Sequence, residues 1–265
     1  MAFKRIINHG RIILLATHTS FFKNTLCIAQ KLTAIGFKVV HPRTLNNLRA
    51  FFLSNLDVDD IIVTLYFTEN ENFRNSLRTL EEKNMRLVDS FSQMQLTEDR
   101  EKTLKVLRSL GIKTPRSFFG KSEKIPDVLG EELVRKHPFG HQVSLVKRDK
   151  FLFSKSRENV YVEERIQNKD GAVRCVMYIF GKIYTRIKKD KFHAGYRGAT
   201  GNEPVVSSTL YEINIAKKVH KKTGMNLFNV DLIKDTVIEI NCCPNFFSYN
   251  PAINHFVKVI QARYK

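Results

Sequence analysis

The chain has 265 residues, of which 43% are hydrophobic, so it can bury a sizeable core as one large or two small globular domains. Its 44 Lys and Arg outnumber its 26 Asp and Glu, and the formal net charge of +18 predicts an acidic partner. The four cysteines form no CxxC pair and no histidine spacing complements them, which indicates neither a zinc site nor a disulfide framework. The apolar run at residues 12–16 is shorter than a signal-peptide core or a membrane span, so we expect a cytoplasmic protein without a membrane partner.

Nucleic acid is the commonest polyanionic partner of a basic protein, yet the sequence has no recognisable zinc finger, RNP aromatic pair or basic tail. The lysines are spread along the chain, so a basic solvated surface explains the charge as well as a polyanion-binding surface does. Charge alone therefore leaves nucleic acid open as a partner.

Residues 1–90 have the pattern of a small parallel α/β domain. Short β-branched and apolar runs alternate with stretches of helical spacing, as in the βα units of a parallel sheet. The first such helix is closed by Gly36. The strand-like runs are residues 11–16, 37–40, 61–65 and 85–88.

The rest of the chain combines two helices with strands joined by tight turns. Thr97 is placed to cap the first helix, which Gly111 ends. Thr209 and Glu212 form a predicted capping box at the start of the second helix, which Gly224 ends. The predicted antiparallel strands between them are residues 143–146, 160–166, 173–180 and 182–187.

A β-hairpin is predicted near the C-terminus. Residues 229–233 and 237–241 alternate apolar and polar side chains, and residues 234–236 fit a three-residue loop between them. In that register Ile233 pairs with Val237, and the polar residues of both strands project from one face.

Three of those polar residues form a candidate metal site. The register places Asp231 opposite Glu239, with Asn241 two residues further along the same face. Two opposed carboxylates repel each other unless a cation lies between them, and Mg²⁺ prefers such oxygen ligands. A solvent-facing polar stripe on an amphipathic hairpin fits the same spacing, so the spacing alone leaves both interpretations open.

This hairpin resembles the terminal motif of ATP-grasp enzymes, in which an Asp on one strand and a Glu-x-Asn or Asp-x-Asn on the next hold the metal ions. The resemblance covers residues 11–260, and its motifs occur in the family's order. It implies the ATP-grasp fold, of α/β class with α+β subdomains, in which a parallel N-terminal domain (1–90) precedes an ATP-grasp domain (91–265). Within the latter, a lid-like subdomain (91–165) and a C-terminal subdomain (166–265), both with antiparallel sheets, are expected to clasp ATP. The implied cofactors are ATP and two Mg²⁺ ions.

The resemblance also implies phosphate-binding residues. Arg100 stands where the family has a basic residue that approaches the ATP phosphates, and Lys136 matches the lysine that contacts the α- and β-phosphates. The family's glycine-rich loop is shortened here to residues 139–142, where His141 is placed to donate a hydrogen bond to a phosphate.

Residues 161–166 resemble the hinge strand that pairs with the adenine edge. The expected contacts there come from Glu163, Glu164 and Ile166, while Asp170 in the next turn is placed to meet the ribose hydroxyls. Because backbone groups recognise adenine, an edge strand with exposed glutamates fits these residues equally well.

A dense group of cations follows the hinge, between it and the metal hairpin. By resemblance, this region supplies the cation that stabilises the transferring phosphoryl group, although a solvated basic loop is the competing interpretation. The predicted catalytic cations are Lys188, Lys189 and Arg186. The predicted substrate contacts are Arg174, Lys182, His193 and Arg197.

Two features favour a kinase. Residues 92–102 and 114–116 resemble the inositol polyphosphate and diphosphoinositol polyphosphate kinases, and the +18 charge suits an acceptor with many phosphates. Glu239 and Asn241 favour a ligase instead, since Glu-x-Asn is the ligase-like form of the motif. We therefore expect transfer of the ATP γ-phosphoryl group to a small polyanion such as an inositol phosphate. The alternative is a RimK-like carboxylate–amine ligase that forms an acyl phosphate.

A third hypothesis is a catalytically inactive ATP-grasp relative or a basic nucleic-acid-binding protein. The kinase and the ligase would share one ATP site and differ only in the acceptor. Acceptor pockets are built from loops that follow no fixed motif, so the sequence does not name the acceptor.

Overall fold

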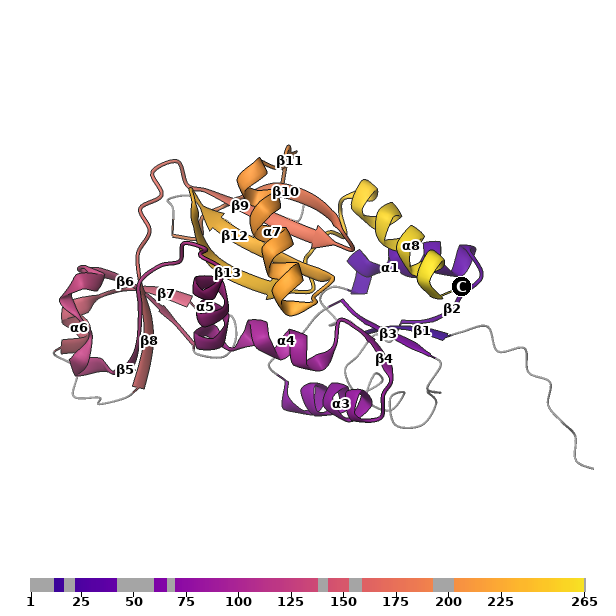
Figure 1. Ribbon diagram of the computed structural model, residues 1–265, viewed down its shortest axis with the longest axis horizontal. Coiled ribbons are helices and arrows are strands. Elements are labelled where there is room, and N and C mark those ends of the chain that lie inside the picture. Colours follow the sequence, from indigo (N-terminus) through magenta and orange to yellow (C-terminus); the bar gives the residue numbers. More distant parts are fainter. Residues whose placement is uncertain are drawn as a thin grey trace, which may run out of the picture. The chain divides into compact units, whose positions relative to one another are not determined.

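The computed structural model describes residues 12–16, 22–41, 60–65, 70–137, 143–152, 159–192 and 203–264. The chain forms two compact units, whose elements are labelled in Figure 1. The first unit comprises Met1–Phe91 and Asn245–Lys265, and the second comprises Ser92–Pro244. The domain boundaries expected at residues 90 and 165 remain predictions.

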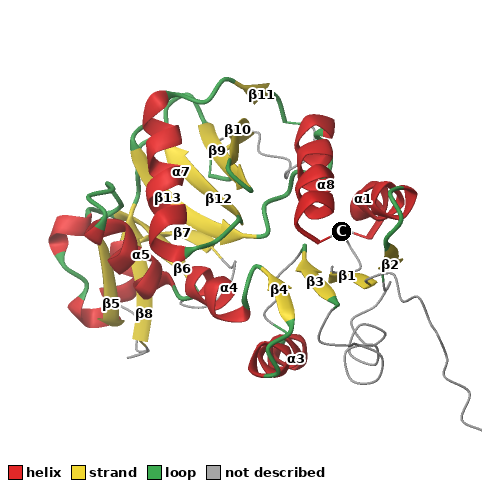
Figure 2. Ribbon diagram, turned by 45° about the vertical axis from the view of Figure 1, so that its right-hand side comes forward, coloured by secondary structure: helices red, strands yellow, loops and turns green. Residues whose placement is uncertain are grey.

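The first unit is built on a four-stranded parallel sheet, as the sequence predicts. Its order is β2-β1-β3-β4, with strands β1 (Ile12–Ala16), β2 (Lys38–Val40), β3 (Ile61–Thr64) and β4 (Arg86–Val88). Helix α3 (Glu71–Glu82) lies on one side of the sheet, and α1 (Phe22–Ala34) and α8 (Asn250–Tyr264) lie on the other (Figure 1 and Figure 2). Every side chain of β3 is buried, because a strand covered on both faces must be apolar throughout.

Helix α8 completes the first unit although it is the last element of the chain. Its buried face includes Phe256, whose ring centroid lies 5.5 Å from that of Phe246. The helix contacts α1, so the two ends of the described chain pack in one core.

The second unit contains a five-stranded antiparallel sheet of order β11-β10-β9-β12-β13. Its strands are β9 (Ala172–Ile179), β10 (Lys182–Lys189), β11 (Val205–Val206), β12 (Leu227–Ile233) and β13 (Thr236–Cys242). Helices α5 (Arg100–Ser109) and α7 (Leu210–Thr223) cover one face, which we call the helix face, and Figure 1 shows α7 lying across the sheet. Core residues of this face include Val176, Phe228, Val230 and Ile240. Because side chains alternate along a strand, the residues between them project from the opposite face.

The capping box predicted for α7 is confirmed. The Thr209 hydroxyl accepts a hydrogen bond from the Glu212 N–H, and the Glu212 carboxylate accepts one from the Thr209 N–H at 2.8 Å. Gly224 ends the helix in the left-handed conformation, which lacks a steric penalty only for glycine. The Glu212 carboxylate also binds Arg174, so this end of the helix is tied to strand β9.

The cap predicted for α5 is wrong by two residues. A separate helix, α4 (Phe91–Glu98), contains Thr97, and Asp99 caps α5 by accepting a hydrogen bond from the Lys102 N–H. The Thr97 hydroxyl instead donates to the Met94 carbonyl at 2.8 Å and accepts from the Cys242 N–H at 3.3 Å. Both residue types are good caps, and the break between the two helices decides which one serves.

A four-stranded antiparallel sheet of order β5-β8-β6-β7 forms the rest of the second unit. Its strands are β5 (Ser117–Lys121), β6 (Glu132–Lys136), β7 (Val143–Lys147) and β8 (Asn159–Glu164). One face packs against α6 (Arg148–Leu152) and the 3-10 turns η2 (Ser122–Lys124) and η3 (Asp127–Leu129) through Leu133, Val160 and Val162. Tyr161 and Glu163, which alternate with those residues, project from the other face.

None of the helices in the described part of the chain combines the length and the apolar character that a bilayer-spanning helix requires.

Candidate functional site

The hairpin predicted to carry the metal site is formed by β12 and β13. Asp231 pairs directly with Glu239, as the sequence predicts. The predicted three-residue loop is wrong, because Ile233 pairs with Thr236 and the loop has only two residues. Lys234, the first of them, has φ of 56°, and this left-handed conformation allows the tighter connection.

A β-bulge reconciles the shorter loop with the confirmed pairing. The register shifts between Asp231 and Leu232, so that Leu232 pairs with Val237 and Ile238 is the extra residue. The shift returns the two carboxylates to one face and keeps Leu232 and Val237 in the core of the helix face. The Ile238 carbonyl accepts a hydrogen bond from Lys136 Nζ at 2.8 Å.

Lys188 neutralises the first of the opposed carboxylates. Its Nζ lies 2.6 Å from Asp231 Oδ2, and Asn229 Nδ2 donates to Asp231 Oδ1 at 2.8 Å. Burial by itself would lower the pKa of Lys188, but the Asp231 carboxylate outweighs burial and holds this pKa above its ordinary value. The ammonium group therefore stays charged at neutral pH.

Arg100 neutralises the second carboxylate. Its Nη2 lies 2.6 Å from Glu239 Oε1, and the Arg100 side chain is only 6% exposed. Burial opposes the charge of the guanidinium, yet the charge of Glu239 and its hydrogen bond raise the pKa of Arg100, with a further contribution from Glu163.

A third buried ion pair lies within the small sheet of the second unit, between neighbouring strands β6 and β8. Lys136 Nζ on β6 lies 2.7 Å from Glu163 Oε2 on β8, and both side chains are nearly inaccessible to solvent. The Tyr161 hydroxyl donates to Glu163 Oε1 at 2.8 Å. Since Lys136 also binds the Ile238 carbonyl of β13, its ammonium fixes the small sheet against the metal hairpin.

Lys191, just after β10, adds a positive charge to this cluster. The residue is exposed, but partial desolvation of its ammonium lowers its pKa, and the cations of Lys136 and Arg100 lower this pKa further, while Glu239 and Asp231 raise it. Among the described residues, no ion pair to Lys191 is formed. In the described part of the chain, Arg100, Lys136 and Lys188 are therefore paired with carboxylates in this cluster, whereas Lys191 is not.

The opposed carboxylates suit a divalent cation. In the structure each of them is paired with a cationic side chain, which offsets their mutual repulsion. Asp231, Glu239 and Asn241 supply hard oxygen donors, and Mg²⁺ commonly uses one or two carboxylates and keeps several waters. Within the described ranges, no three His, Cys, Asp or Glu residues gather as a metal cluster, and the metal site at Asp231, Glu239 and Asn241 remains a prediction.

Asn229 was not anticipated as a site residue. It pairs with Asn241 across the hairpin and contacts Asp231, and its side chain is almost fully buried. The period of two along β12 is the signal that could have identified it, since residues 229 and 231 share a face. Lys191 belongs to the dense group of cations that the sequence shows between the hinge and the hairpin, but no role was assigned to it.

Several predicted residues lie away from this cluster. Glu164 binds Arg116 through both carboxylate oxygens and shares the face of Val160 and Val162, opposite Glu163. Arg174 lies on the helix face, paired with Glu212. Their roles in nucleotide or substrate binding remain predictions that no contact of the described chain supports.

Strand alternation separates the predicted catalytic cations. Arg186 and Lys188 project from the face of the large sheet that is opposite the helix face and carries Asp231, which we call the site face. Arg186 forms an ion pair there with Glu203, with an N···O distance of 3.3 Å. Lys189 is exposed and projects from the helix face. Lys182 also lies on the site face, but six residues before Lys188, which is about 20 Å along the strand.

The remaining predicted contacts lie in loops. Ile166 and Asp170 lie between β8 and β9, with Asp170 in an exposed turn, and neither has a contact that defines a role. His141, His193 and Arg197 lie outside the described residues.

Comparison with known proteins identifies the fold. No protein-family model matches the chain, and no curated protein matches its sequence. Solved structures do match over nearly the whole length, at 12–17% sequence identity. An ATP-grasp ligase associated with a ribosomally synthesised peptide from Chryseobacterium gregarium, in complex with ADP and a leader and core peptide, has a TM-score of 0.72 at 12% identity and covers 96% of this chain and 97% of its own.

Two further solved structures are similar to this chain over nearly its whole length. D-alanine–D-alanine ligase from Bacillus anthracis, complexed with ATP, has a TM-score of 0.65 at 17% identity, with 96% and 95% of the two chains covered. A RimK domain ATP-grasp protein from Sphaerobacter thermophilus has a TM-score of 0.63 at 15% identity, with 94% and 98% covered. The chain has the ATP-grasp fold. The fold expected from the terminal Asp and Glu-x-Asn motif is thereby confirmed, whereas the resemblance to inositol polyphosphate kinases has no counterpart among these three ATP-grasp neighbours.

The buried pair of Lys136 and Glu163 yields a stability prediction. Lys136→Met should lower the free energy of unfolding by about 3–5 kcal/mol, because it leaves a buried carboxylate without its cation. Adding Glu163→Gln should recover most of this loss, since the neutral amide still accepts from Tyr161. Urea denaturation of both variants measures the difference. Equal destabilisation by the single and the double variant would show that the two side chains are not paired.

Proposed function

We propose that this chain is an ATP- and Mg²⁺-dependent ligase that activates a carboxylate and joins it to an amine. The observation that carries the proposal is the opposed pair of Asp231 and Glu239, each held by a cation on the site face of an ATP-grasp sheet. Glu239 and Asn241 form the ligase-like version of the motif. Two of the three neighbours described above are named as ligases, and they support this reaction class over a kinase.

Each side chain of the cluster has a role in this proposal. Asp231, Glu239 and Asn241 would hold Mg²⁺, while Arg100 and Lys136 would contact the phosphates of ATP. These cations are paired with carboxylates, and the ion pairs orient the side chains of the cluster. Binding of Mg²⁺ and ATP would replace these ion pairs, because the carboxylates would bind the metal ion and the cations would bind the phosphates.

The chemistry follows from this arrangement. A carboxylate oxygen of the substrate attacks the γ-phosphorus, the bond from that phosphorus to the β–γ bridging oxygen breaks, and ADP leaves. The amine then attacks the acyl carbon of the acyl phosphate, phosphate leaves, and the amine releases a proton. Lys188 would stabilise the charge on the transferring phosphoryl group. Bound Mg²⁺ would neutralise negative charge on the phosphate oxygens.

No protein nucleophile is required. Cys175 lies between Asp231 and Arg186 in the sheet, which makes it the obvious candidate for a covalent intermediate. Burial raises the pKa of its thiol, and the neighbouring Asp231 carboxylate raises it further, so the reactive thiolate is not available at neutral pH. The proposed reaction therefore proceeds by direct attack of the substrate.

The kinase expected from sequence has weaker support. In residues 114–116, part of the stretch that resembles inositol polyphosphate kinases, the Thr114 hydroxyl and the Pro115 carbonyl accept hydrogen bonds from Arg108, and Arg116 binds Glu164. These contacts stabilise the turn after α5 and give this stretch a structural role. The high positive charge still suits a polyanionic acceptor, so a kinase is the second candidate.

Nucleotide binding is the first expected outcome. At Mg²⁺·ATP concentrations of about 100 times Kd, the free energy of unfolding of the wild-type chain should rise by about 2.7 kcal/mol, which raises Tm by roughly 5–10 °C. Asp231→Asn and Glu239→Gln should abolish this increase relative to their own ligand-free Tm values. Asp235→Asn is the control, because Asp235 lies in the loop of the same hairpin and binds Lys113. A wild-type Tm that never responds to ATP would leave the third hypothesis, an inactive relative or a nucleic-acid-binding protein.

The reaction products distinguish the ligase from the kinase. Incubation with Mg²⁺·ATP, hydroxylamine and a panel of amino acids, glutamyl peptides and acidic peptides should yield a hydroxamate and phosphate, because hydroxylamine traps an acyl phosphate. Inositol phosphates should give no new phosphoester or phosphoanhydride in a parallel assay by mass spectrometry. A phosphorylated inositol product without any hydroxamate would establish the kinase instead.

Lys188 and Lys189 give a test of the catalytic cation. Lys188→Met should lower kcat in the hydroxamate assay by about 100-fold or more, because the transferring phosphoryl group loses a preorganised cation. Lys189→Met should change kcat by less than about threefold, since its side chain projects from the other face of β10. The reverse ranking would contradict the assignment made from strand alternation.

A further inference from the structure

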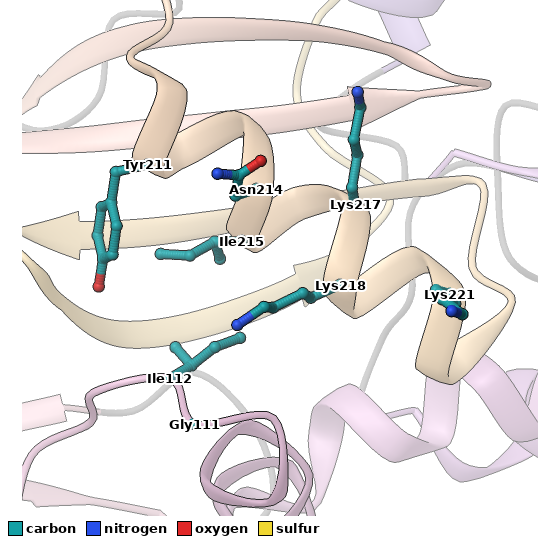
Figure 3. Close-up of a pocket in the computed structure, with 8 residues that line it drawn as sticks. All are labelled: Gly111, Ile112, Tyr211, Asn214, Ile215, Lys217, Lys218 and Lys221. Carbon is teal, nitrogen blue, oxygen red and sulfur yellow. The ribbon is translucent and has the colours of Figure 1, made fainter.

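A groove lies on the helix face of the large sheet, on the side opposite Asp231. It has a volume of about 380 Å³ and runs along α7 beside the turn that follows α5 (Figure 3). Ile112 from that turn and Ile215 from α7 are both buried core residues and supply its apolar floor. Figure 3 shows the Lys218 side chain extending from α7 toward Ile112.

The residues that line the groove carry positive charge and no carboxylate. Lys217, Lys218 and Lys221 project from α7, and in the described part of the chain none of them forms an ion pair. Lys218 Nζ donates to the Leu110 carbonyl at 3.2 Å, a contact that leaves its charge uncompensated. The acidic residue of α7, Glu212, is buried and binds Arg174.

A second carboxylate, that of Asp235, lies near one end of the groove. The Tyr211 hydroxyl donates to the Asp235 carbonyl at 2.7 Å, which fixes the tyrosine ring at the rim. The Asp235 carboxylate is bound by Lys113 Nζ at 3.0 Å. It is therefore not available to neutralise the groove lysines.

Helix stability does not explain these lysines. Cations in the last turn of a helix interact favourably with the helix dipole, which accounts for Lys221. Lys217 and Lys218 precede that turn, where the dipole effect has faded. Lys217 and Lys221 are four residues apart and repel each other. An anionic ligand would remove this repulsion.

We propose that this groove docks an acidic peptide segment. The lining from Tyr211 to Lys221 spans ten residues of helix, or about 15 Å, which matches roughly five residues of an extended chain. A peptide can place an apolar side chain on Ile112 and Ile215 and carboxylates beside the lysines. Single-stranded nucleic acid is usually bound by several aromatic rings on which its bases stack, whereas Tyr211 is the single aromatic ring among the lining residues.

Exposed apolar side chains extend the same surface. Leu210 is 74% exposed and Tyr211 is 43% exposed, which places both among the most exposed large apolar residues of the described chain. They follow the capping residue Thr209 at the start of α7. A peptide with alternating acidic and apolar residues therefore meets apolar contacts at one end of the groove and lysines toward the other.

The docking surface is separate from the proposed ATP site, because the sheet lies between them. Peptide docking should therefore occur without nucleotide, and it does not depend on the ligase proposal. A chain that binds the peptide but not ATP would overturn the proposed function alone. A chain that binds ATP but not the peptide would overturn this inference alone.

The probe is a fluorescein-labelled peptide of alternating acidic residues and leucines, titrated with the full-length protein in fluorescence anisotropy. Replacement of Lys217, Lys218 and Lys221 by Gln should weaken binding by about tenfold, because three charge contacts are lost together. Gln keeps the helix propensity of Lys, so the fold should be retained, which circular dichroism verifies. A peptide with Gln in place of each acidic residue should not bind.

The matched control replaces three exposed lysines outside the groove by Gln, namely Lys83, Lys124 and Lys258. It lowers the net charge by the same amount and should change peptide affinity by less than about twofold. Equal weakening in both triple variants would show that the overall field of the protein, not the groove, attracts the peptide. Preferential loss of binding to a labelled single-stranded RNA in the groove variant, with peptide binding unchanged, would assign the surface to nucleic acid and overturn the proposal.

Discussion

The repulsion between two opposed carboxylates is the constraint around which the second unit is organised. Asp231 and Glu239 are paired across a hairpin, where like charges destabilise a sheet unless cations balance them. Lys188 from β10 and Arg100 from α5 supply that balance. Each comes from a different element, so the charge requirement of one hairpin ties the β10 strand and the α5 helix to it.

The five-stranded sheet that contains this hairpin separates two kinds of surface. On one face, buried cations and carboxylates form a compact set of ion pairs that suits a metal and a polyphosphate. On the other face, α5 and α7 cover an apolar core, and the exposed side of α7 carries lysines beside the groove. Strand alternation assigns the residues of β9, β10 and β12 to one face or the other, which is why Lys188 and Lys189 of β10 serve different surfaces, whereas in β13 the bulge at Ile238 interrupts the alternation.

Local patterns predicted much of this arrangement. The parallel sheet of the first unit follows from its short apolar runs, and the capping box of Thr209 and Glu212 follows from their spacing. The hairpin loop was predicted one residue too long because the sequence does not show that Lys234 adopts a left-handed conformation. The bulge at Ile238 compensates, so the pairing of the carboxylates was right although the loop was wrong.

The sequence by itself determined which residues carry charge on each strand, and hence that Asp231 and Glu239 face the same way. Only the tertiary structure decided their partners. Arg100 follows a helix break and Lys136 lies on another sheet, and no periodicity relates either residue to the hairpin. Ion pairs depend on distances between elements that are remote in sequence, and packing sets those distances. The groove along α7 arises in the same way, since the turn at Ile112 and the face of α7 meet only in the folded chain.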